Sequence, residues 1–298
     1  MRLLTFRRNG ADGLGVLRPG QADEVVELKQ PPDMLTLIEA GDEGLTQVRA
    51  ALSSSRPTTH RLQDIELLAP LTPRLNIVAI GRNYGKHAEE TAKQGKDPEP
   101  PTIFTKAITS LTHPYSNIAV DPAISEQLDW EVELAVVIGR GGANIRRADA
   151  AAHVFGYTVI NDVSARDIQF GWGGQFFKGK SLDASSPIGP WIVTRDEIDD
   201  PQALSLRLRV NGELKQDGNT RDMTFSVDAI VEWASKGMTL PPGTIIATGT
   251  PDGVGYIRKP PEYLKPGDVM ETEVEGIGVL RNRIVSAVSQ RVPAVAIP

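Results

Sequence analysis

The clearest hydrophobic pattern lies in residues 128–139, LDWEVELAVVIG, where apolar and polar residues alternate before an apolar run ends at a glycine. A period of two predicts a β-strand. One face would carry Trp130 and the even-numbered apolar residues that follow it, and the other would carry Glu131 and Glu133, about 6.7 Å apart. At an effective dielectric near 20 these charges would repel by roughly 2–3 kcal/mol. A positive group is therefore expected beside them.

Other β-branched runs, broken by Gly and Pro, follow one another from residue 76 onward. One helix is expected over residues 225–237, FSVDAIVEWASKG, with Ser226 as its cap and Gly237 as its stop. Many strands and few helices favour a β-rich α+β fold, a mixed barrel or roll, over a Rossmann sheet. The remaining strand candidates are NIVAIG, FGYTVIND, GPWIVT, LSLRLRVNGEL, TIIATGT and DVMETEVEGIGVLRNRIV.

The first 70 residues have a different pattern, with three short strand candidates (RLLTF, GLGVLRP and EVVELK) before a helical stretch over residues 33–54. The segment APLTPRLN ends this part of the chain. We therefore expect a small N-terminal α+β module over residues 1–72 and a larger domain over 73–298. The polar, Pro-rich segment 93–101 is expected to be a mobile loop.

Composition narrows the function classes. The chain has 298 residues, 40% of them hydrophobic, and a net charge of −6 without a Lys/Arg run, which argues against nucleic acid as a partner. With no Cys and only four His, disulfides and thiolate or histidine-rich zinc sites are not expected. The absence of a long apolar run and of a signal-peptide pattern predicts a cytoplasmic protein that does not bind membranes.

Three carboxylates are the strongest candidate site. Asp162 ends the strand candidate FGYTVIND, and strand ends beside loops often carry ligand groups. An isolated Glu-x-Glu pair is more often a solvated strand face, but carboxylates without Cys or His suit Mg²⁺ or Mn²⁺. If Glu131, Glu133 and Asp162 repel one another, Glu131→Gln should abolish metal-dependent activity and stabilise the metal-free protein.

Further candidates are individually weaker. His87 and Glu90 in IGRNYGKHAEE are three residues apart, so on a helical turn the carboxylate would orient the imidazole; an incidental surface pair would look the same. Lys178 and Lys180 lie between glycines, where a lysine either meets a developing oxyanion or is solvated. TGTPDGVG, with Thr250, offers hydroxyls and backbone N–H groups to an anion, or is a plain turn.

Taken in order, five segments resemble the fumarylacetoacetate hydrolase family: GRNYGKHAEE, LDWEVELAVVIG, GYTVINDVSARDIQ, GKSLDASSPIGP and TGTPDGVG. The likeness runs from about Ile77 to Val285. It implies the mixed β-sandwich roll of that family and a homodimer. The N-terminal 70 residues resemble the variable leading module of the longer bacterial members.

The resemblance also implies roles for individual residues. It implies three metal ligands, a His–Glu dyad that activates water on a lid over the site, an oxyanion-stabilising lysine and three residues that contact substrate oxygens. In the same order these are Glu131, Glu133 and Asp162; His87 and Glu90; Lys180; and Arg166, Gln169 and Thr250.

The reaction expected first is hydrolysis of a C–C bond in a 2,4-dioxo acid such as an acylpyruvate, with Mg²⁺ or Mn²⁺ holding the enolate that leaves. One alternative is a decarboxylase or keto–enol isomerase of an oxo-diacid, such as oxaloacetate or a catabolic 2-hydroxy-dienoate. The dyad of His87 and Glu90 favours hydrolysis only moderately, because it could also shuttle protons. A second alternative is a non-catalytic protein that binds small molecules, which would have no need of the dyad.

Overall fold

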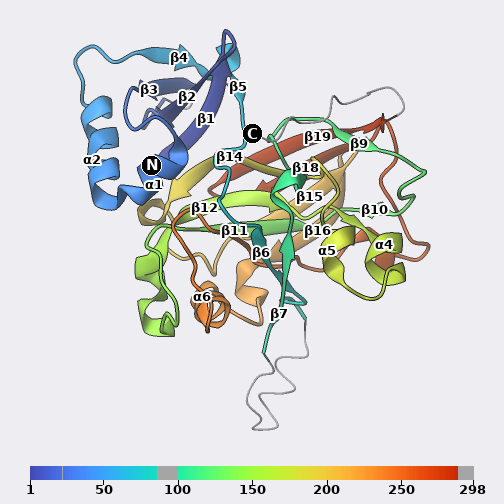
Figure 1. The fold of residues 1–298 in the computed structure, drawn as a ribbon. Helices are drawn as coiled ribbons and strands as arrows, with labels where there is room; N and C mark the ends of the chain where they lie inside the picture. Colours follow the sequence, from blue (N-terminus) through green and yellow to red (C-terminus); the bar gives the residue numbers. More distant parts are fainter. Residues whose placement is uncertain (22, 86–99, 288–298) are drawn as a thin grey trace.

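A computed structural model describes residues 1–21, 23–85 and 100–287 (Figure 1). Its largest element is a twisted sheet of twelve strands, whose main path runs in the order β4-β3-β2-β1-β14-β12-β11-β17-β6-β7, with β5 on β1 and β8 on β14. Its strands are β1 (Arg2–Arg8), β2 (Ala11–Leu17), β3 (Glu24–Leu28), β4 (Thr59–Arg61), β5 (Glu66–Leu67), β6 (Ile77–Gly81), β7 (Thr102–Lys106), β8 (Leu111–Thr112), β11 (Val132–Ile138), β12 (Val154–Asn161), β14 (Ser186–Thr194) and β17 (Ile245–Ala247).

A second sheet of five strands packs on the first in the order β16-β15-β18-β19-β9, and β10 pairs with β13. These are β9 (Ile118–Val120), β10 (Leu128–Asp129), β13 (Ser164–Ala165), β15 (Ser205–Val210), β16 (Glu213–Asn219), β18 (Val269–Val274) and β19 (Gly278–Ser286). The helices are α1 (Met34–Glu39), α2 (Gly41–Leu52), α4 (Arg166–Gly171), α5 (Phe176–Gly179) and α6 (Val227–Ser235). Short 3-10 turns are η1 (Leu62–Asp64), η2 (Ile108–Ser110), η3 (Arg147–His153), η4 (Arg195–Glu197), η5 (Thr220–Asp222) and η6 (Gly255–Ile257).

Strand β11 runs through the middle of the molecule and is buried on both faces. Its even-numbered residues, with Trp130 before them, join the core between the two sheets. Ala135 and Val137 join the other core, which continues into the first 70 residues. The predicted alternation is confirmed, but a solvated face for Glu131 and Glu133 is wrong, because both side chains are buried.

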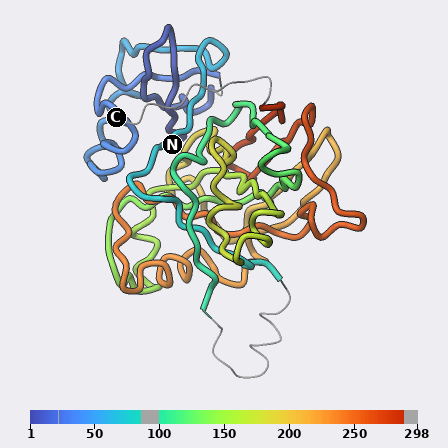
Figure 2. The backbone as a smooth tube through the Cα atoms, turned by 45° about the vertical axis from the view of Figure 1, so that its right-hand side comes forward, coloured from blue at the N-terminus to red at the C-terminus, as the bar shows by residue number. Residues whose placement is uncertain are grey.

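The N-terminal part is built on the main sheet. Strand β1 pairs antiparallel with β14, with Leu3 opposite Ile192, and both residues lie in one core. Figure 2 shows the first 70 residues gathered at one side of the molecule. The single helix predicted over 33–54 is two, α1 and α2, because the chain turns at Gly41, whose φ of +56° is in the left-handed region. A domain boundary at residue 72 stays a prediction.

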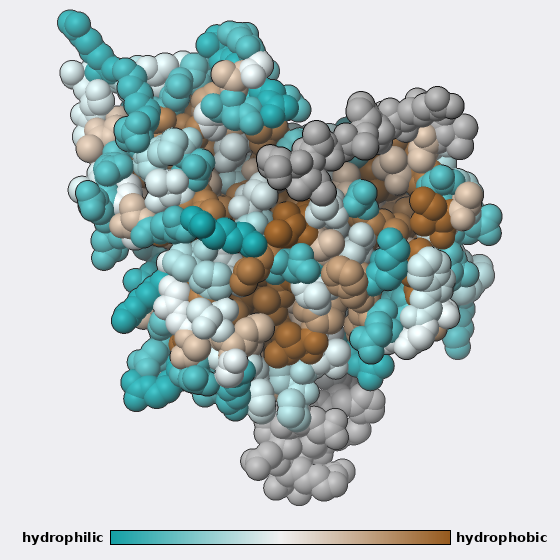
Figure 3. All heavy atoms as spheres, viewed as in Figure 1, coloured by the Kyte–Doolittle hydropathy of each residue, from teal (hydrophilic) through white to brown (hydrophobic). Residues whose placement is uncertain are grey.

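The other elements expected from the sequence are close to the observed ones. LSLRLRVNGEL forms a hairpin, β15–β16, because Asn211 and Gly212 have φ of +53° and +81°, as a tight hairpin turn requires. Helix α6 follows Ser226 and stops before Gly237, although the serine hydroxyl bonds to Asp228 rather than to the helix backbone. No helix among the described residues is long and apolar enough to cross a membrane. The face in Figure 3 carries hydrophobic residues near its centre and hydrophilic ones around them.

Candidate metal centre and active site

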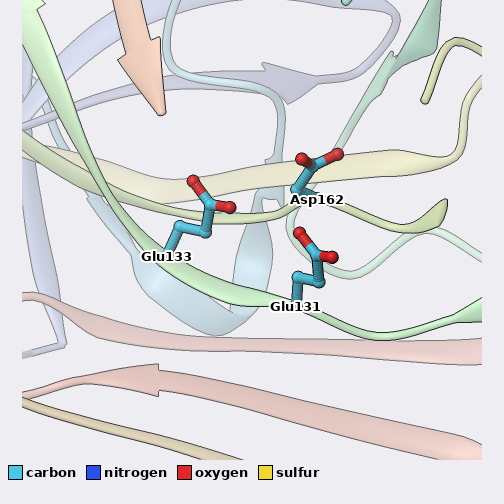
Figure 4. A group of neighbouring side chains, drawn as sticks. All are labelled: Glu131, Glu133 and Asp162. Atoms are coloured by element: carbon cyan, nitrogen blue, oxygen red, sulfur yellow. The ribbon is translucent and has the colours of Figure 1, made fainter. Parts of the chain in front are cut away.

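Three carboxylates meet where β11 begins and β12 ends. Antiparallel pairing places Val132 opposite Asn161, so the residues just outside that pair, Glu131 and Asp162, are neighbours. Glu133 is on β11, on the same face as Glu131 (Figure 4). All three side chains are buried, and one oxygen of each lies within 4.8 Å of the others. The predicted set is therefore assembled in space, and it could hold a metal ion.

The positive charge that the strand pattern demands is already supplied by side chains of the protein. Lys180 Nζ lies 2.6 Å from Glu131 Oε2 and 2.7 Å from Asp162 Oδ2. Lys106, fully buried, donates to Asp162 Oδ1 at 2.5 Å, and Arg166 Nη2 donates to Glu131 Oε1 at 2.6 Å. Every oxygen of Glu131 and Asp162 therefore faces a cation.

Glu133 is different. Its partner among the described residues is a backbone group, the N–H of Gly249, which donates to Oε2 at 2.8 Å. Burial, and then the charges of Asp162 and Glu131, raise the pKa of Glu133 well above its ordinary value of 4.5. Asp162 behaves oppositely: burial alone would raise its pKa, but Lys106 and Lys180 outweigh burial and lower it. Glu133 is thus the one carboxyl of the three without a side-chain cation beside it among the described residues.

The uneven distribution of cations around the three carboxylates shows whether the site fits a metal ion. Buried oxygen donors with uncompensated negative charge suit a hard divalent ion, and the ion would favour the ionised form of Glu133. Burial alone would lower the pKa of Lys180, but Asp162 and Glu131 outweigh it and raise the pKa, so Lys180 stays protonated. The residues present therefore fit a divalent cation next to a fixed ammonium group.

Arg166 is held by a second buried acid, Asp129. Its Nε donates to Asp129 Oδ2 at 2.8 Å, and its Nη1 donates to the Gln169 side-chain oxygen at 2.8 Å. Asp129 also accepts the backbone N–H groups of Gly255 and Tyr256, at 2.6 and 3.1 Å. In this geometry Arg166 organises the site, and its predicted contact with substrate oxygens would need the guanidinium to share these bonds.

A cavity of about 220 Å³ opens over these residues. Thr250 lines it, but its hydroxyl donates to the carbonyl of Val132 at 2.9 Å and accepts from the Gln216 amide at 2.8 Å. The buried hydroxyl of Thr248 donates a hydrogen bond to the carbonyl of Leu134. It therefore cannot donate to an anionic ligand in the way that the sequence suggested. The lining includes Ile80, Gly81, Arg82, Tyr84, Phe104, Glu131, Glu133, Arg166, Gln169, Phe170, Phe176, Lys180, Thr250, Pro251, Asp252, Val254, Tyr256 and Ile257.

The remaining sequence candidates divide into two groups. His87, Glu90 and the loop expected over 93–101 fall mostly in the range 86–99, outside the described residues, so the dyad and the lid stay predictions. Lys178 is exposed on α5, in contrast to Lys180. Sequence reasoning missed Lys106 and Asp129, although Lys106 ends an apolar, strand-like run and Asp129 begins the alternation that continues with Glu131 and Glu133.

Together these features define a β-sandwich roll whose buried carboxylate site could hold a metal ion beside a ligand-sized cavity. The chain belongs to the fumarylacetoacetate hydrolase family: residues 76–285 match the model described as fumarylacetoacetate (FAA) hydrolase C-terminal. The resemblance carried by the five segments and the fold that it implied are confirmed.

Relatives extend the match to nearly the whole chain. A mitochondrial oxaloacetate tautomerase of Bos taurus is 43% identical over 293 residues, covering 96% of this chain and 92% of that protein. The solved fumarylacetoacetate hydrolase of Exiguobacterium antarcticum is 38% identical, with a TM-score of 0.83 over 96% and 99% of the two chains. A 5-carboxymethyl-2-hydroxymuconate delta-isomerase of Mycobacterium smegmatis is 33% identical, with a TM-score of 0.76 over 96% and 100%. These similar proteins are named as enzymes, and two of the three names describe isomerisation.

Proposed function

We propose that the protein is a keto–enol tautomerase of a 2-oxo diacid such as oxaloacetate, with Mg²⁺ or Mn²⁺ as cofactor. The observation that carries the proposal is the carboxylate triad in contact with the Lys180 ammonium under a small cavity. That arrangement suits any reaction that passes through an enolate. The 43% identity to an oxaloacetate tautomerase favours isomerisation over the hydrolysis that the sequence first suggested.

The chemistry requires a proton to leave C3 and another to reach the 2-oxo oxygen. Glu131, Glu133 and Asp162 would hold the cation, which when bound would polarise the 2-oxo group and acidify C3. Lys180 is a fixed, protonated donor at the cavity floor and would stabilise negative charge developing on the oxygen. His87, oriented by Glu90, is our proposed proton carrier at C3.

Hydrolysis of a 2,4-dioxo acid remains the second candidate. It would use the same cation and lysine but would add a water molecule activated by His87. The observation in its favour is the 38% identity to the solved protein named fumarylacetoacetate hydrolase. A non-catalytic binding role is disfavoured, because the similar proteins are named as enzymes. A homodimer and a cytoplasmic location stay predictions, to be checked by light scattering and cell fractionation.

One substrate panel separates these reactions. Metal-stripped protein, with Mg²⁺ returned to half of it, is given the enol form of oxaloacetate and an acylpyruvate. Loss of enol absorbance without release of pyruvate, only in the Mg²⁺ sample, is the expected result. Cleavage of the acylpyruvate at a higher kcat/KM than enol conversion would make the protein a hydrolase, and pyruvate with CO₂ from oxaloacetate would make it a decarboxylase.

A further inference from the structure

We propose that Arg82 is the residue that selects a diacid, by receiving the substrate carboxylate farther from the cation. The proposal rests on the proposed function for the reaction, but it concerns a different part of the cavity. Arg82 lies just after β6, lines the cavity, and has an exposed side chain. Arginine is well suited to this task, because its planar guanidinium binds a carboxylate through two parallel hydrogen bonds.

The cations in contact with the cavity differ in their partners. Lys180 and Arg166 line it, but both are engaged by carboxylates. Lys106 lies beneath, fully buried against Asp162. Arg82 is the third cation of the lining, and it forms no ion pair with any residue in the described ranges. An arginine of the cavity lining whose guanidinium these carboxylates do not engage is a candidate to bind an anionic ligand.

Charge balance in the site supports the same assignment. Asp129, Glu131, Glu133 and Asp162 oppose Lys106, Arg166 and Lys180, which leaves one net negative charge when all are ionised. A divalent cation would turn this into one net positive charge, enough for the carboxylate next to the 2-oxo group. The exposed charged residues of the described lining are Arg82 and Asp252, so Arg82 is the cation there that can meet the second carboxylate of a diacid.

The backbone conformation of Arg82 also indicates a functional role. Arg82 has a φ of +57°, in the left-handed region that is costly for residues with a side chain. Its neighbours hold it there: Gly81 pairs with Thr102, and the Asn83 side chain bonds to backbone groups of Phe225 and Thr248 at 2.7–3.1 Å. A glycine would fit this position without strain, so an arginine indicates a task for its side chain.

Tyr84, which also lines the cavity, carries a polar group near Arg82 that no described residue satisfies. The hydroxyl of Tyr84, two residues along the same loop, is buried and has no hydrogen-bond partner among the described residues. Burial, together with the charges of Glu133 and Asp222, raises its pKa, so the hydroxyl remains a donor. Buried donors are normally satisfied, and no group among the described residues satisfies this one.

The test compares oxaloacetate with its 4-methyl ester, which keeps the 2-oxo acid and loses the distal charge. In Arg82→Gln, KM for oxaloacetate should rise about 10-fold or more with little change in kcat, and KM for the ester should stay within about two-fold. Arg82→Lys should keep part of the preference. Arg140→Gln, which removes an exposed arginine outside the cavity, is the matched control and should change neither KM.

Two further variants separate loss of the guanidinium from misfolding and from a change in the overall charge of the cavity. Arg82→Gly relieves the backbone strain, so it should lose the diacid preference while Tm stays equal or rises, which excludes misfolding. Asp252 is the exposed acid of the same described lining. Asp252→Asn should lower KM for oxaloacetate by up to about two-fold, whereas Arg82→Gln should raise it. Equal shifts for diacid and ester in Arg82→Gln would overturn the proposal.

Failure of the proposed function is recognised separately. If the wild type converts neither compound, the reaction is wrong, and Arg82 is tested by calorimetry on the Mg²⁺-loaded protein. The probes are 2-oxoglutarate and 2-oxopentanoate, a diacid and a monoacid of equal chain length. Arg82→Gln should weaken binding of 2-oxoglutarate about 10-fold and leave 2-oxopentanoate unchanged. Equal binding of the two probes by the wild type, or no binding of either, would overturn the role of Arg82.

Discussion

Glu133 and Asp162 belong to the same site, but their pKa values are shifted in opposite directions. Asp162 is fully buried between two lysines, and its pKa is lowered despite burial. Glu133 is nearly as deeply buried, yet it accepts one backbone N–H, and its pKa is raised. The difference indicates that the protein neutralises one side of its carboxylate cluster with its own cations and leaves the other side for a ligand. It also indicates which substitutions should stabilise the metal-free protein and which should destabilise it.

The largest effect should come from removing the ammonium group of Lys106, one of the two lysines that neutralise Asp162. Lys106→Met leaves Asp162 Oδ1 and the carbonyl of Lys180 without their buried donor, while Lys180 still pairs with Asp162 Oδ2, so the free energy of unfolding should fall by about 3–5 kcal/mol. Urea denaturation measures this loss. Lys215→Met is the matched control: its partners Glu213 and Glu262 are exposed, so its cost should be about 1 kcal/mol or less. Equal losses of unfolding free energy in the two variants would show that burying the ion pair does not increase its contribution to stability.

The next effect is on catalysis, at Lys180. Removing its ammonium removes the donor proposed for the developing oxyanion, so Lys180→Met should lower kcat for oxaloacetate enol conversion by about 10²–10³-fold. Lys178→Met, an exposed lysine two residues away, should retain the wild-type rate. Enol absorbance decay with saturating Mg²⁺ provides the measurement. A wild-type kcat in Lys180→Met would limit this lysine to neutralising Glu131 and Asp162.

A smaller effect, a gain in stability of the metal-free protein, is expected from removing the charge of Glu133, which has no cation beside it among the described residues. Because the folded-state pKa of Glu133 is raised, the metal-free folded protein binds a proton more tightly than the unfolded chain does. Its stability should therefore fall as pH rises from the ordinary value of 4.5 through the raised folded pKa. Glu133→Gln removes this fall and should stabilise the metal-free protein at neutral pH by about 1–3 kcal/mol.

Glu131→Gln provides the contrast. The sequence alone led us to expect that this substitution would relieve repulsion and stabilise the metal-free protein. The ion pairs to Arg166 and Lys180 reverse that expectation, because the substitution leaves two buried cations with less negative charge around them. Thermal melts in chelator across pH should show Glu133→Gln above the wild type and Glu131→Gln below it. A shift in the same direction for both variants would contradict the division into a compensated and an uncompensated side.

Some of this site could be predicted because a strand has a strict period. Alternation placed Glu131 and Glu133 on one face, and the end of the next strand placed Asp162 beside them. The cations could not be found in this way, since Lys106 is 56 residues from Asp162 and nothing in the spacing reveals that β7 ends at the site. The break between α1 and α2 depends on the backbone at Gly41, which periodicity does not report.

Calorimetric titration of the metal-stripped wild type with Mg²⁺, repeated in buffers of different ionisation enthalpy, is the decisive test of the carboxylate triad as a metal site. Binding to the triad should proceed with about one Mg²⁺ per chain and should release protons, because the cation favours ionised Glu133. Glu133→Gln should bind Mg²⁺ at least about 10-fold more weakly and release fewer protons. Equal affinity and equal proton release in the two proteins would contradict this assignment, because the metal would then bind elsewhere.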